Sequence, residues 1–550
     1  MKIFKNLAIK SHWLVVALAV YFGSVLNMAV WRYAFKNIEL TGAPVVVFSL
    51  GLPVFVGACL LIIFSLLVWP YVAKPLLAVL LVVSAVTNYV MFQYGIFIDS
   101  DMVRNLFETT TREAMDYFNL SGVLWVTFTG VVPAALLLRT RIIFKPALKE
   151  LKTRLVMVLI CLAAIGLIAA LSFKEYAVWG RNNKNVTRLI NPTNYLYATV
   201  RYFQRQALAN HAFVHLDEDV SLDPYLDNHP TVFVLVVGET ARTQNFSLNG
   251  YPRVTNPRLA VEDIISFADV SSCGTATAIS VPCMFSGLPR SQFNVNKASY
   301  HENLVDLIQN AGYQVRWREN DEGCKKVCDR VPTDYPIYTN NPKYCDGVYC
   351  HDEALLDGLE DYLRALTGDA FIVLHTMGSH GPSYYKRYPD QFKVFQPTCD
   401  TSEVQNCDRE AIANTYDNTI LYTDHVLAEL IGLLKKFPKY EIGMLYLSDH
   451  GESLGENGVY LHGLPYRIAP AEQTQVPMIL WMSEVMKKED HIDYECLRAR
   501  AAEPLSHDNL FHSMVGLMEL DTVVYDPALD MFAPCRTKPL PAMVSSKSLD

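Results

Sequence analysis

Five long apolar stretches before about residue 175 constrain the fold of this 550-residue chain more than any other feature. They cover residues 13–31, 45–69, 76–98, 122–138 and 155–173. Each is close to the roughly 20 residues that cross a bilayer as a helix. Trp13, Trp31 and Trp69 lie at the ends of stretches, where indole rings favour the membrane interface. The sequence therefore predicts five transmembrane helices.

Basic residues around these stretches predict their orientation. Lys2, Lys5 and Lys10 precede the first stretch. The fourth and fifth stretches are joined by a loop with Arg139, Arg141, Lys145, Lys149, Lys152 and Arg154. Such segments remain in the cytoplasm, so five spans place the C-terminal part outside. A cleaved signal peptide is the alternative for the first stretch, but its apolar core is too long and further spans follow.

Composition supports a chain of two parts, since 51% of residues are hydrophobic and only 19% charged. Residues 1–173 are predicted to form the membrane domain. Residues 174–230 turn polar and aromatic, and we expect an amphipathic bridging segment along the membrane surface. Residues 231–550 are predicted to form the exported catalytic domain. The net charge of −9 does not favour a nucleic-acid partner.

The cysteines are distributed as this topology requires. Cys59 and Cys161 lie in predicted spans and are expected to be inert thiols. The other ten follow residue 270: Cys273, Cys283, Cys324, Cys328, Cys345, Cys350, Cys399, Cys407, Cys496 and Cys535. An even number in an exported domain indicates disulfides, and pairing of sequence neighbours is suggested but not proven. Cysteine zinc sites are the alternative, although the spacings do not follow paired CxxC motifs.

The exported part has the pattern of an α/β domain. Residues 231–237, 371–374 and 444–447 are apolar runs typical of strands buried on both faces. Helical stretches such as 301–311 and 411–436 separate them. This alternation predicts a mostly parallel sheet.

Acidic and imidazole side chains follow three of these strands. Glu239 follows the first, His380 lies shortly after the second, and Asp449 and His450 follow the third. Functional groups of such sheets gather beyond the carboxyl ends of the strands, and these ligand types suit Zn²⁺. Taken singly, each residue could equally be a helix cap or a turn residue. Together they predict a metal site.

Several motifs give the chain a family resemblance. They are Gly238-Glu239-Thr240, Ser272-Cys-Gly-Thr-Ala-Thr277, Val281-Pro-Cys-Met-Phe285, Ser379-His-Gly-Pro382, Ser448-Asp-His-Gly-Glu-Ser-Leu-Gly-Glu-Asn457 and Tyr460-Leu-His-Gly463. With the five spans they resemble the phosphoethanolamine–lipid A transferases, Gram-negative inner-membrane enzymes that include the mobile colistin-resistance group. The resemblance covers essentially the whole chain, and the motifs are specific only as a set.

The resemblance implies an alkaline-phosphatase/sulfatase-like catalytic domain with one tightly bound Zn²⁺, and additional zinc is left open. The implied ligands are Glu239, Thr277, Asp449 and His450. Thr277 is implied as the nucleophile that carries phosphoethanolamine as a phosphothreonine. His380 and His462 match positions for substrate or a second metal, and Lys325 matches a phosphate-contacting lysine. Asn105, Thr109 and Glu113 match positions that hold the lipid donor.

Chemical reasoning agrees with these implied roles. A threonine hydroxyl becomes a competent nucleophile when a metal lowers its pKa. Without the neighbouring motifs, Thr277 is an ordinary loop threonine. Asn105, Thr109 and Glu113 are spaced by four residues, which predicts one helix face, although a plain solvated face has the same pattern.

The resulting hypothesis is a zinc-dependent phosphotransferase that moves phosphoethanolamine from phosphatidylethanolamine to a lipid A phosphate. The expected protein is a monomer in the inner membrane, with a cytoplasmic N-terminus and a periplasmic catalytic domain, and it confers polymyxin resistance by lowering surface negative charge. Alternatives are transfer to a core sugar or periplasmic glucan, a phosphoglycerol transferase, a sulfatase-type hydrolase and a non-catalytic zinc scaffold.

Overall fold

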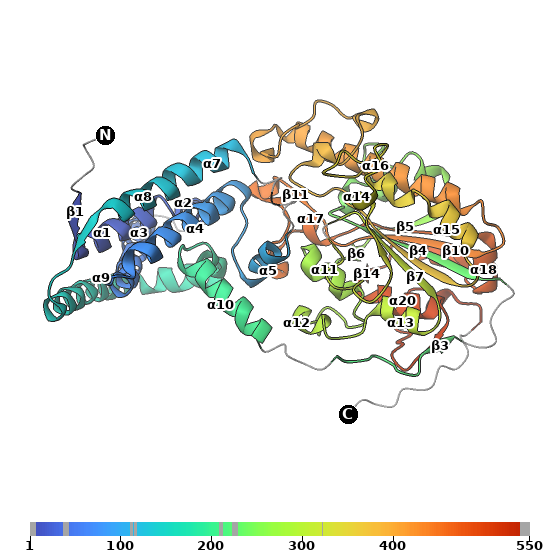
Figure 1. Ribbon diagram of the computed structural model, residues 1–550, viewed down its shortest axis with the longest axis horizontal. Coiled ribbons are helices and arrows are strands. Elements are labelled where there is room, and N and C mark those ends of the chain that lie inside the picture. Colours follow the sequence, from blue (N-terminus) through green and yellow to red (C-terminus); the bar gives the residue numbers. More distant parts are fainter. Residues whose placement is uncertain are drawn as a thin grey trace. The chain divides into compact units, whose positions relative to one another are not determined.

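The computed structural model describes residues 7–36, 43–109, 114, 118–207, 213–222, 229–321 and 323–538. The chain divides into two compact units. The first comprises Met1–Val103 and Phe118–Tyr202, and the second comprises Arg104–Tyr117 and Phe203–Asp550. The first unit is helical, and the second contains the large sheet (Figure 1).

The helices of the first unit are α1 (Ser11–Ser24), α2 (Met28–Lys36), α3 (Ala43–Leu67), α4 (Ala73–Tyr94), α5 (Ser100–Glu108), α7 (Leu120–Val126), η1 (Thr127–Val131), α8 (Val132–Arg139), α9 (Ala147–Asn182), η2 (Lys184–Arg188) and α10 (Thr193–Ala207). The boundary between the units falls within α5 and within α10. Two short strands, β1 (Ala8–Lys10) and β2 (Arg141–Ile143), pair in parallel. This pairing joins the N-terminal segment to the basic loop after α8.

Among the described residues, four helical segments are long and apolar enough to span a membrane, namely Val46–Leu67, Ala73–Tyr94, Leu120–Arg139 and Ala147–Ser172. The pair α1 and α2 makes a fifth if it is one span, bent by 48°. At the bend, the buried amide of Asn27 donates to the carbonyls of Phe22 and Asn191, both at 2.9 Å. The predicted first span therefore contains a break that its apolar composition did not reveal.

The fourth span contains a π-helical turn next to a proline. Pro133 has no N–H, so the Thr129 carbonyl lacks its usual helical donor, and the Tyr21 hydroxyl donates to it at 2.9 Å. Gly130 lies in this turn, and a Cβ there would be 2.8 Å from the Cβ of Ala85. Glycine thus permits the close contact between this span and α4.

The second unit is built on a seven-stranded sheet with the order β5-β13-β10-β4-β9-β7-β8. Its strands are β5 (Ile264–Phe267), β13 (Met478–Met482), β10 (Glu441–Ser448), β4 (Thr231–Gly238), β9 (Ala370–His375), β7 (Gln314–Glu319) and β8 (Thr333–Asp334). Neighbours from β10 to β8 are parallel, and β13 is antiparallel to both of its neighbours. The predicted mostly parallel α/β sheet is confirmed.

Helices cover both faces of this sheet (Figure 1). The helices of the second unit are α11 (Thr277–Met284), α12 (Val295–Ala298), α13 (Leu304–Asn310), α14 (Pro336–Thr339), α15 (Leu359–Ala365), α16 (Arg409–Leu434), α17 (Ala471–Thr474), α18 (Glu484–Glu489), α19 (Tyr494–Ala499) and α20 (Asp508–Leu517). Side chains of α11, α13 and α20 share one hydrophobic core with alternate residues of β4, β9 and β10.

Short elements complete the unit. The strand pairs are β3 (Ser221–Leu222) with β15 (Leu520–Asp521), β6 (Val270–Ser271) with β14 (Leu505–Ser506), and β11 (Ser453–Leu454) with β12 (Tyr460–Leu461). The single-turn helices are η3 (Thr243–Asn245), η4 (Ser247–Asn249), η5 (Leu259–Val261), η6 (Asp352–Leu356), η7 (Tyr384–Lys386), η8 (Asp390–Phe392), η9 (Val404–Asn406), η10 (Glu456–Gly458), η11 (Tyr466–Ile468) and η12 (Ala533–Cys535).

Candidate active site

The register of the parallel sheet brings the first candidate ligands together. Ser448 of β10 is opposite Gly238 of β4, so the next residues, Asp449 and Glu239, emerge side by side. The Asp449 amide also donates to the Gly238 carbonyl at 2.9 Å. The loop after β9 closes over Glu239, where a Cβ on Gly378 (φ +49°) would lie 2.5 Å from the Glu239 carbonyl oxygen. A side chain at position 378 would displace this loop.

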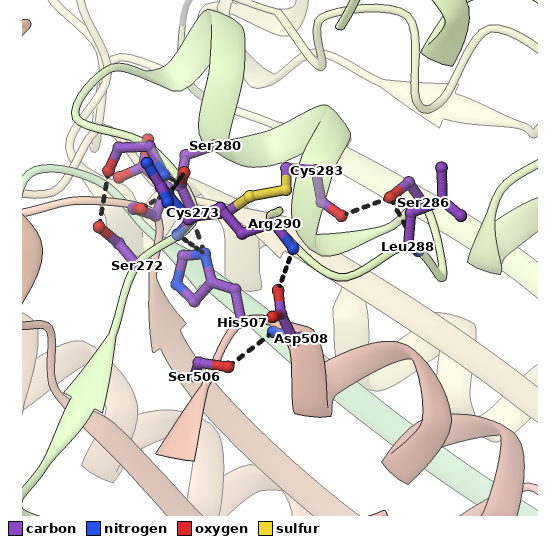
Figure 2. The surroundings of a disulfide bond; sticks show 12 residues. Ser272, Cys273, Ser280, Cys283, Ser286, Leu288, Arg290, Ser506, His507 and Asp508 are labelled. Carbon is purple, nitrogen blue, oxygen red and sulfur yellow. Dashed lines mark hydrogen bonds between the residues drawn. A yellow bond between two sulfur atoms is a disulfide. The ribbon is translucent and has the colours of Figure 1, made fainter. Parts of the chain in front are cut away.

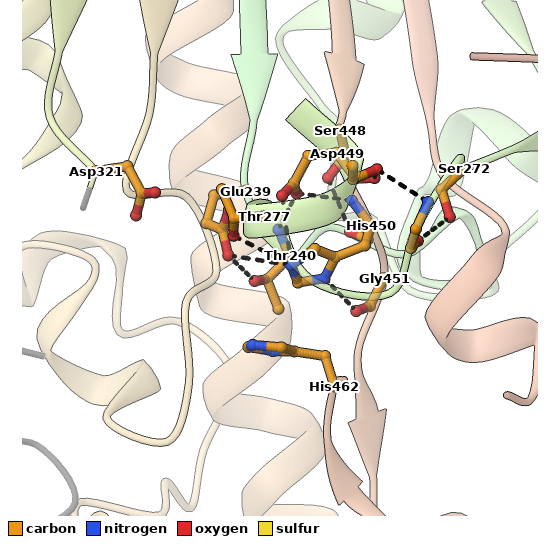
Figure 3. Close-up of polar contacts among 12 residues, drawn as sticks. Glu239, Thr240, Ser272, Thr277, Asp321, Ser448, Asp449, His450, Gly451 and His462 are labelled. Atoms are coloured by element: carbon orange, nitrogen blue, oxygen red, sulfur yellow. Dashed lines mark hydrogen bonds and ion pairs between the residues drawn. The ribbon is translucent and has the colours of Figure 1, made fainter. Parts of the chain in front are cut away.

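Four side chains meet at this edge of the sheet (Figure 3). The Thr277 hydroxyl donates to Glu239 Oε2 at 3.1 Å and lies 3.4 Å from His450 Nε2. The distance from His450 Nε2 to Asp449 Oδ2 is 3.3 Å, and to Glu239 Oε1 it is 3.6 Å. The structure thus brings together the four residues that the resemblance implied as ligands.

The donor set has the chemistry of a metal site. Glu239, Asp449 and His450 each offer a ligand atom, and these atoms lie within 4.8 Å of one another. His450 Nδ1 donates to the Gly451 carbonyl at 2.9 Å, which leaves the Nε2 lone pair directed at the carboxylates. Among the described residues, the buried Asp449 Oδ2 has no hydrogen-bond donor. A cation fits these observations.

Electrostatics leads to the same conclusion. Burial, and then the charge of Asp449, raises the pKa of Glu239 well above its ordinary value. Burial raises the pKa of Asp449 to about 6. Burial lowers the pKa of His450 well below its ordinary value, so its imidazole is neutral. Two buried carboxylates beside a neutral imidazole are costly without a positive charge, which a divalent metal would supply.

Thr277 is the first residue of α11, which follows an extended residue, Ala276. The positive end of the helix dipole therefore lies at the Thr277 hydroxyl, where it favours anions. A small pocket opens from this hydroxyl and is lined by Asn105, Glu108, Thr109, Ala276, Thr277, Ala278, Lys325, His380 and His462. One lysine, two imidazoles and a helix terminus around a hydroxyl suit a phosphoryl group.

Comparison with known proteins identifies the family. Residues 56–207 match the model described as phosphoethanolamine transferase EptA/EptB, and residues 231–520 match the sulfatase model. The chain is 43% identical to phosphoethanolamine transferase EptA of Escherichia coli K12 over 95% of this chain and 96% of the relative. This chain belongs to the phosphoethanolamine transferase family.

Two further relatives support the assignment. Phosphatidylethanolamine transferase Mcr-1 of Escherichia coli is 36% identical over 85% of this chain and 89% of that protein. The solved structure of lipooligosaccharide phosphoethanolamine transferase A from Neisseria meningitidis matches with a TM-score of 0.94 at 39% identity. That match covers 97% of this chain and 100% of the Neisseria chain. The membrane-plus-sulfatase-like architecture of the transferase family is therefore shared along the whole chain.

The structure places the remaining predicted residues of this transferase as follows. His380, His462 and Lys325 line the pocket beside Thr277. Asn105 and Thr109 line it too, and both the amide and the hydroxyl of Thr109 donate to the Asn105 carbonyl, at 2.7 and 2.6 Å. Asn105 and Thr109 therefore keep the spacing of one helical turn at the end of α5, which ends at Glu108. Glu113 lies outside the described residues.

Glu452 is a neighbour of the site that the sequence analysis did not select. Its Oε2 is 3.0 Å from His462 Nδ1, and its Oε1 accepts from the Tyr384 hydroxyl at 2.9 Å. Burial opposes a charge on His462, but the Glu452 carboxylate outweighs it and raises the pKa of His462 to about 9. Glu452 thus orients the imidazole that faces the pocket. Its position within the Ser448–Asn457 motif was the available signal.

A second acidic cluster shares Glu239 and was also not selected. Asp321 and His375 approach Glu239 from β7 and β9, and His375 Nε2 lies 3.8 Å from Asp321 Oδ2. His375 Nδ1 is 2.9 Å from Glu319 Oε2. Burial opposes a charge on His375, but Glu319 outweighs it and raises the pKa of His375 to about 9. The cluster therefore carries its own compensating cation.

Five disulfides cross-link segments of the second unit of this transferase. The structure has the pairs Cys273–Cys283, Cys324–Cys328, Cys345–Cys350, Cys399–Cys407 and Cys496–Cys535. These are the neighbour pairs that the sequence suggested. Cys59 and Cys161 are free and lie in α3 and α9. The first disulfide spans the N-terminus of α11, so it restrains the segment that carries Thr277.

Proposed function

We propose that this chain transfers phosphoethanolamine from phosphatidylethanolamine to a phosphate group of lipid A, with Thr277 as nucleophile. The observation that carries the proposal is the buried Thr277 hydroxyl, held between Glu239 and His450 at 3.1 and 3.4 Å at the N-terminus of α11. Membership of the transferase family supports the reaction class. A relative at 26% identity is a Kdo(2)-lipid A phosphoethanolamine 7''-transferase.

The chain's own residues account for both half-reactions. The Thr277 oxygen bonds to phosphorus as the bond from phosphorus to the diacylglycerol oxygen breaks. The Thr277 proton passes to Glu239, and protonated His462 gives a proton to the leaving diacylglycerol oxygen. An oxygen of the lipid A phosphate then bonds to the same phosphorus and gives its proton to His462, while the Thr277 oxygen leaves phosphorus and takes back the proton from Glu239. Lys325, His380 and His462 supply positive charge and N–H donors to the phosphoryl oxygens.

We infer that the metal site is a zinc site. Glu239, Asp449, His450 and the Thr277 hydroxyl would hold the ion, since two carboxylates and an imidazole Nε2 are common zinc ligands. When bound, zinc would lower the pKa of the threonine hydroxyl and neutralise phosphate charge. One tightly held ion is proposed here.

The proposed location is the inner membrane of a Gram-negative bacterium, with a cytoplasmic N-terminus and a periplasmic catalytic unit. The β1–β2 pair supports this, because it joins the two basic segments that the charge rule assigns to the cytoplasm. The five disulfides in the second unit fit an oxidising compartment. The enzyme is proposed to act as a monomer on the bilayer. Added phosphoethanolamine would weaken the attraction of lipid A for cationic peptides such as polymyxin.

Mass spectrometry of the Thr277 peptide tests the proposal. The purified, zinc-loaded protein is mixed with phosphatidylethanolamine and no acceptor, and a phosphoethanolamine adduct on Thr277 is expected. Thr277→Ala should lose the adduct. Thr275→Ala is the matched control, because Thr275 is buried in the same loop and donates to Leu464 instead of the site.

Other outcomes of this experiment reject the proposal in distinct ways. A phosphoglycerol adduct formed from phosphatidylglycerol would assign the chain to another lipid transferase. No adduct from either lipid, with metal bound, would leave a non-catalytic zinc-binding role. If the adduct forms but its phosphoethanolamine passes to a core sugar or a glucan and not to lipid A, the proposed donor and nucleophile are confirmed and the proposed acceptor is wrong.

A further inference from the structure

We propose that His507 is a positioning residue for the transfer reaction, which holds the segment that carries Thr277 against the strand end that carries Asp449 and His450. The inference rests on the proposed function and deepens it. His507 touches none of the reacting atoms. It acts through the backbones of Cys273 and Ser448.

The His507 ring joins two segments that are distant in the sequence, and Figure 2 shows it beside Cys273 and Ser280 of the first segment. Its Nδ1 accepts from the Cys273 amide at 3.1 Å, and its Nε2 donates to the Ser448 carbonyl at 2.9 Å. The ring is buried, with 1% of its surface exposed. Because an amide only donates and a carbonyl only accepts, these partners select the neutral tautomer with its proton on Nε2. Burial favours the same neutral form by lowering the pKa of His507 to about 4.

Ser280 adds a third connection at the same point. Its hydroxyl donates to the Asp449 carbonyl and accepts from the Gly274 amide at 3.2 Å. Ser280 Oγ also lies 3.4 Å from His507 Nδ1. Helix α11, the loop before it and the end of β10 therefore meet at one buried imidazole.

The fold fixes the position of this imidazole. β14 pairs in parallel with β6, with Leu505 opposite Val270 and Ser506 opposite Ser271. His507 follows directly, and its amide donates to the Ser271 carbonyl at 3.0 Å. The strand pair thus delivers His507 beside Cys273, just as the β4–β10 pair delivers Asp449 beside Glu239.

Small displacements of the segments bound by His507 would move the Thr277 hydroxyl relative to Asp449 and His450. Cys273 begins the loop that leads to Thr277, and Ser448 directly precedes Asp449 and His450. Without the two hydrogen bonds of His507, these segments could shift relative to each other. A misplacement of about 1 Å lowers the rate of an oriented reaction by about 100-fold. We therefore expect the effect in kcat and not in substrate binding.

Three substitutions separate the two bonds. His507→Leu removes both of them. His507→Asn keeps an acceptor near the position of Nδ1, and His507→Gln keeps a donor near the position of Nε2. His512→Leu is the matched control, because His512 is buried on α20, the helix that begins directly after His507, and its Nδ1 accepts from the Asp526 backbone amide.

The test uses the full-length protein in detergent with phosphatidylethanolamine as donor. It measures kcat, KM, zinc content, melting temperature and hydrogen exchange of peptides that cover residues 270–284. His507→Leu is expected to lower kcat by about 100-fold, with KM and zinc content unchanged and faster exchange around Cys273. His507→Asn and His507→Gln should each recover part of kcat. His512→Leu should lower the melting temperature with kcat within about threefold of the wild type.

Several results would overturn the proposal. One is a kcat within about threefold of the wild type in His507→Leu. Another is an equal loss of kcat in His512→Leu, which would mean that general stability sets the rate. If His507→Leu does not fold, the test rests on His507→Asn and His507→Gln. A kcat equal to that of the wild type in both variants would refute the positioning role of His507. A wild-type protein that forms no Thr277 adduct refutes the proposed function itself. Unchanged hydrogen exchange around Cys273 in the His507 variants refutes the positioning role of His507 separately.

Discussion

Zinc binding to the apoprotein is expected to release about one proton near neutral pH. The reason is that burial and the charge of Asp449 raise the pKa of Glu239 well above its ordinary value in the apoprotein, and a bound cation would lower that pKa again. Asp449, with its pKa raised to about 6 by burial, is mostly ionised at pH 7.5. His450 is already neutral, because burial lowers its pKa. Glu239 is therefore the ligand that we expect to lose a proton when the ion binds.

The sign and size of the pH dependence follow from this count. Between about pH 6 and the raised pKa of Glu239, release of one proton makes the apparent affinity rise about tenfold per pH unit, which is about 1.4 kcal/mol. Below about pH 6 Asp449 is also protonated, so two protons are released and the affinity falls more steeply. Calorimetric titration with zinc, in buffers of different ionisation enthalpy, measures the number of protons released.

Two variants test the assignment to Glu239. Glu239→Gln should weaken zinc binding and abolish the proton release near pH 7.5. Glu441→Gln is the matched control, because Glu441 is equally buried but lies at the opposite end of β10, and it should release the proton like the wild type. A pH-independent affinity in the wild type, or an unchanged release in Glu239→Gln, would refute the reasoning.

Three further outcomes are expected. Replacing Cys496 and Cys535 by serine should lower the free energy of unfolding by about 4 kcal/mol in denaturant titrations. The reason is that this disulfide closes a loop of 39 residues and so lowers the entropy of the unfolded chain. A loss below about 1 kcal/mol would contradict this reasoning. Lys325→Ala should lower kcat/KM for phosphatidylethanolamine by at least about tenfold while zinc content is kept, and Lys325→Arg should retain more activity, since the pocket needs a cation. The pKa of His507 is about 4 in the folded protein and about 6.5 in the unfolded chain. Its contribution to the free energy of unfolding, up to about 3 kcal/mol, is therefore present above about pH 6.5 and is lost as the pH falls to about 4. A melting temperature that falls equally with pH in the wild type and in His507→Gln would contradict this.

The membrane part and the sheet were largely predictable because both depend on local pattern. Runs of about 20 apolar residues can be satisfied only as spanning helices, and fully apolar runs bounded by turns are typical of parallel strands. The same logic missed β7, in which Arg316 and Arg318 alternate with the buried Val315 and Trp317. It also missed the bend near Asn27, because the polar side chain there is satisfied by Asn191, far along the chain.

Residue types and their order along the chain were enough to predict the chemistry: which side chains follow the strands, which motifs resemble the transferase family, and that ten cysteines follow residue 270. The geometry of the site depends on the tertiary structure. The register of β4 against β10 sets Glu239 beside Asp449, and the register of β6 against β14 sets His507 beside Cys273, which is 234 residues away in the sequence. The physical reason is that residue pattern fixes an element through local periodicity, whereas register between distant strands is set by their packing in the common core.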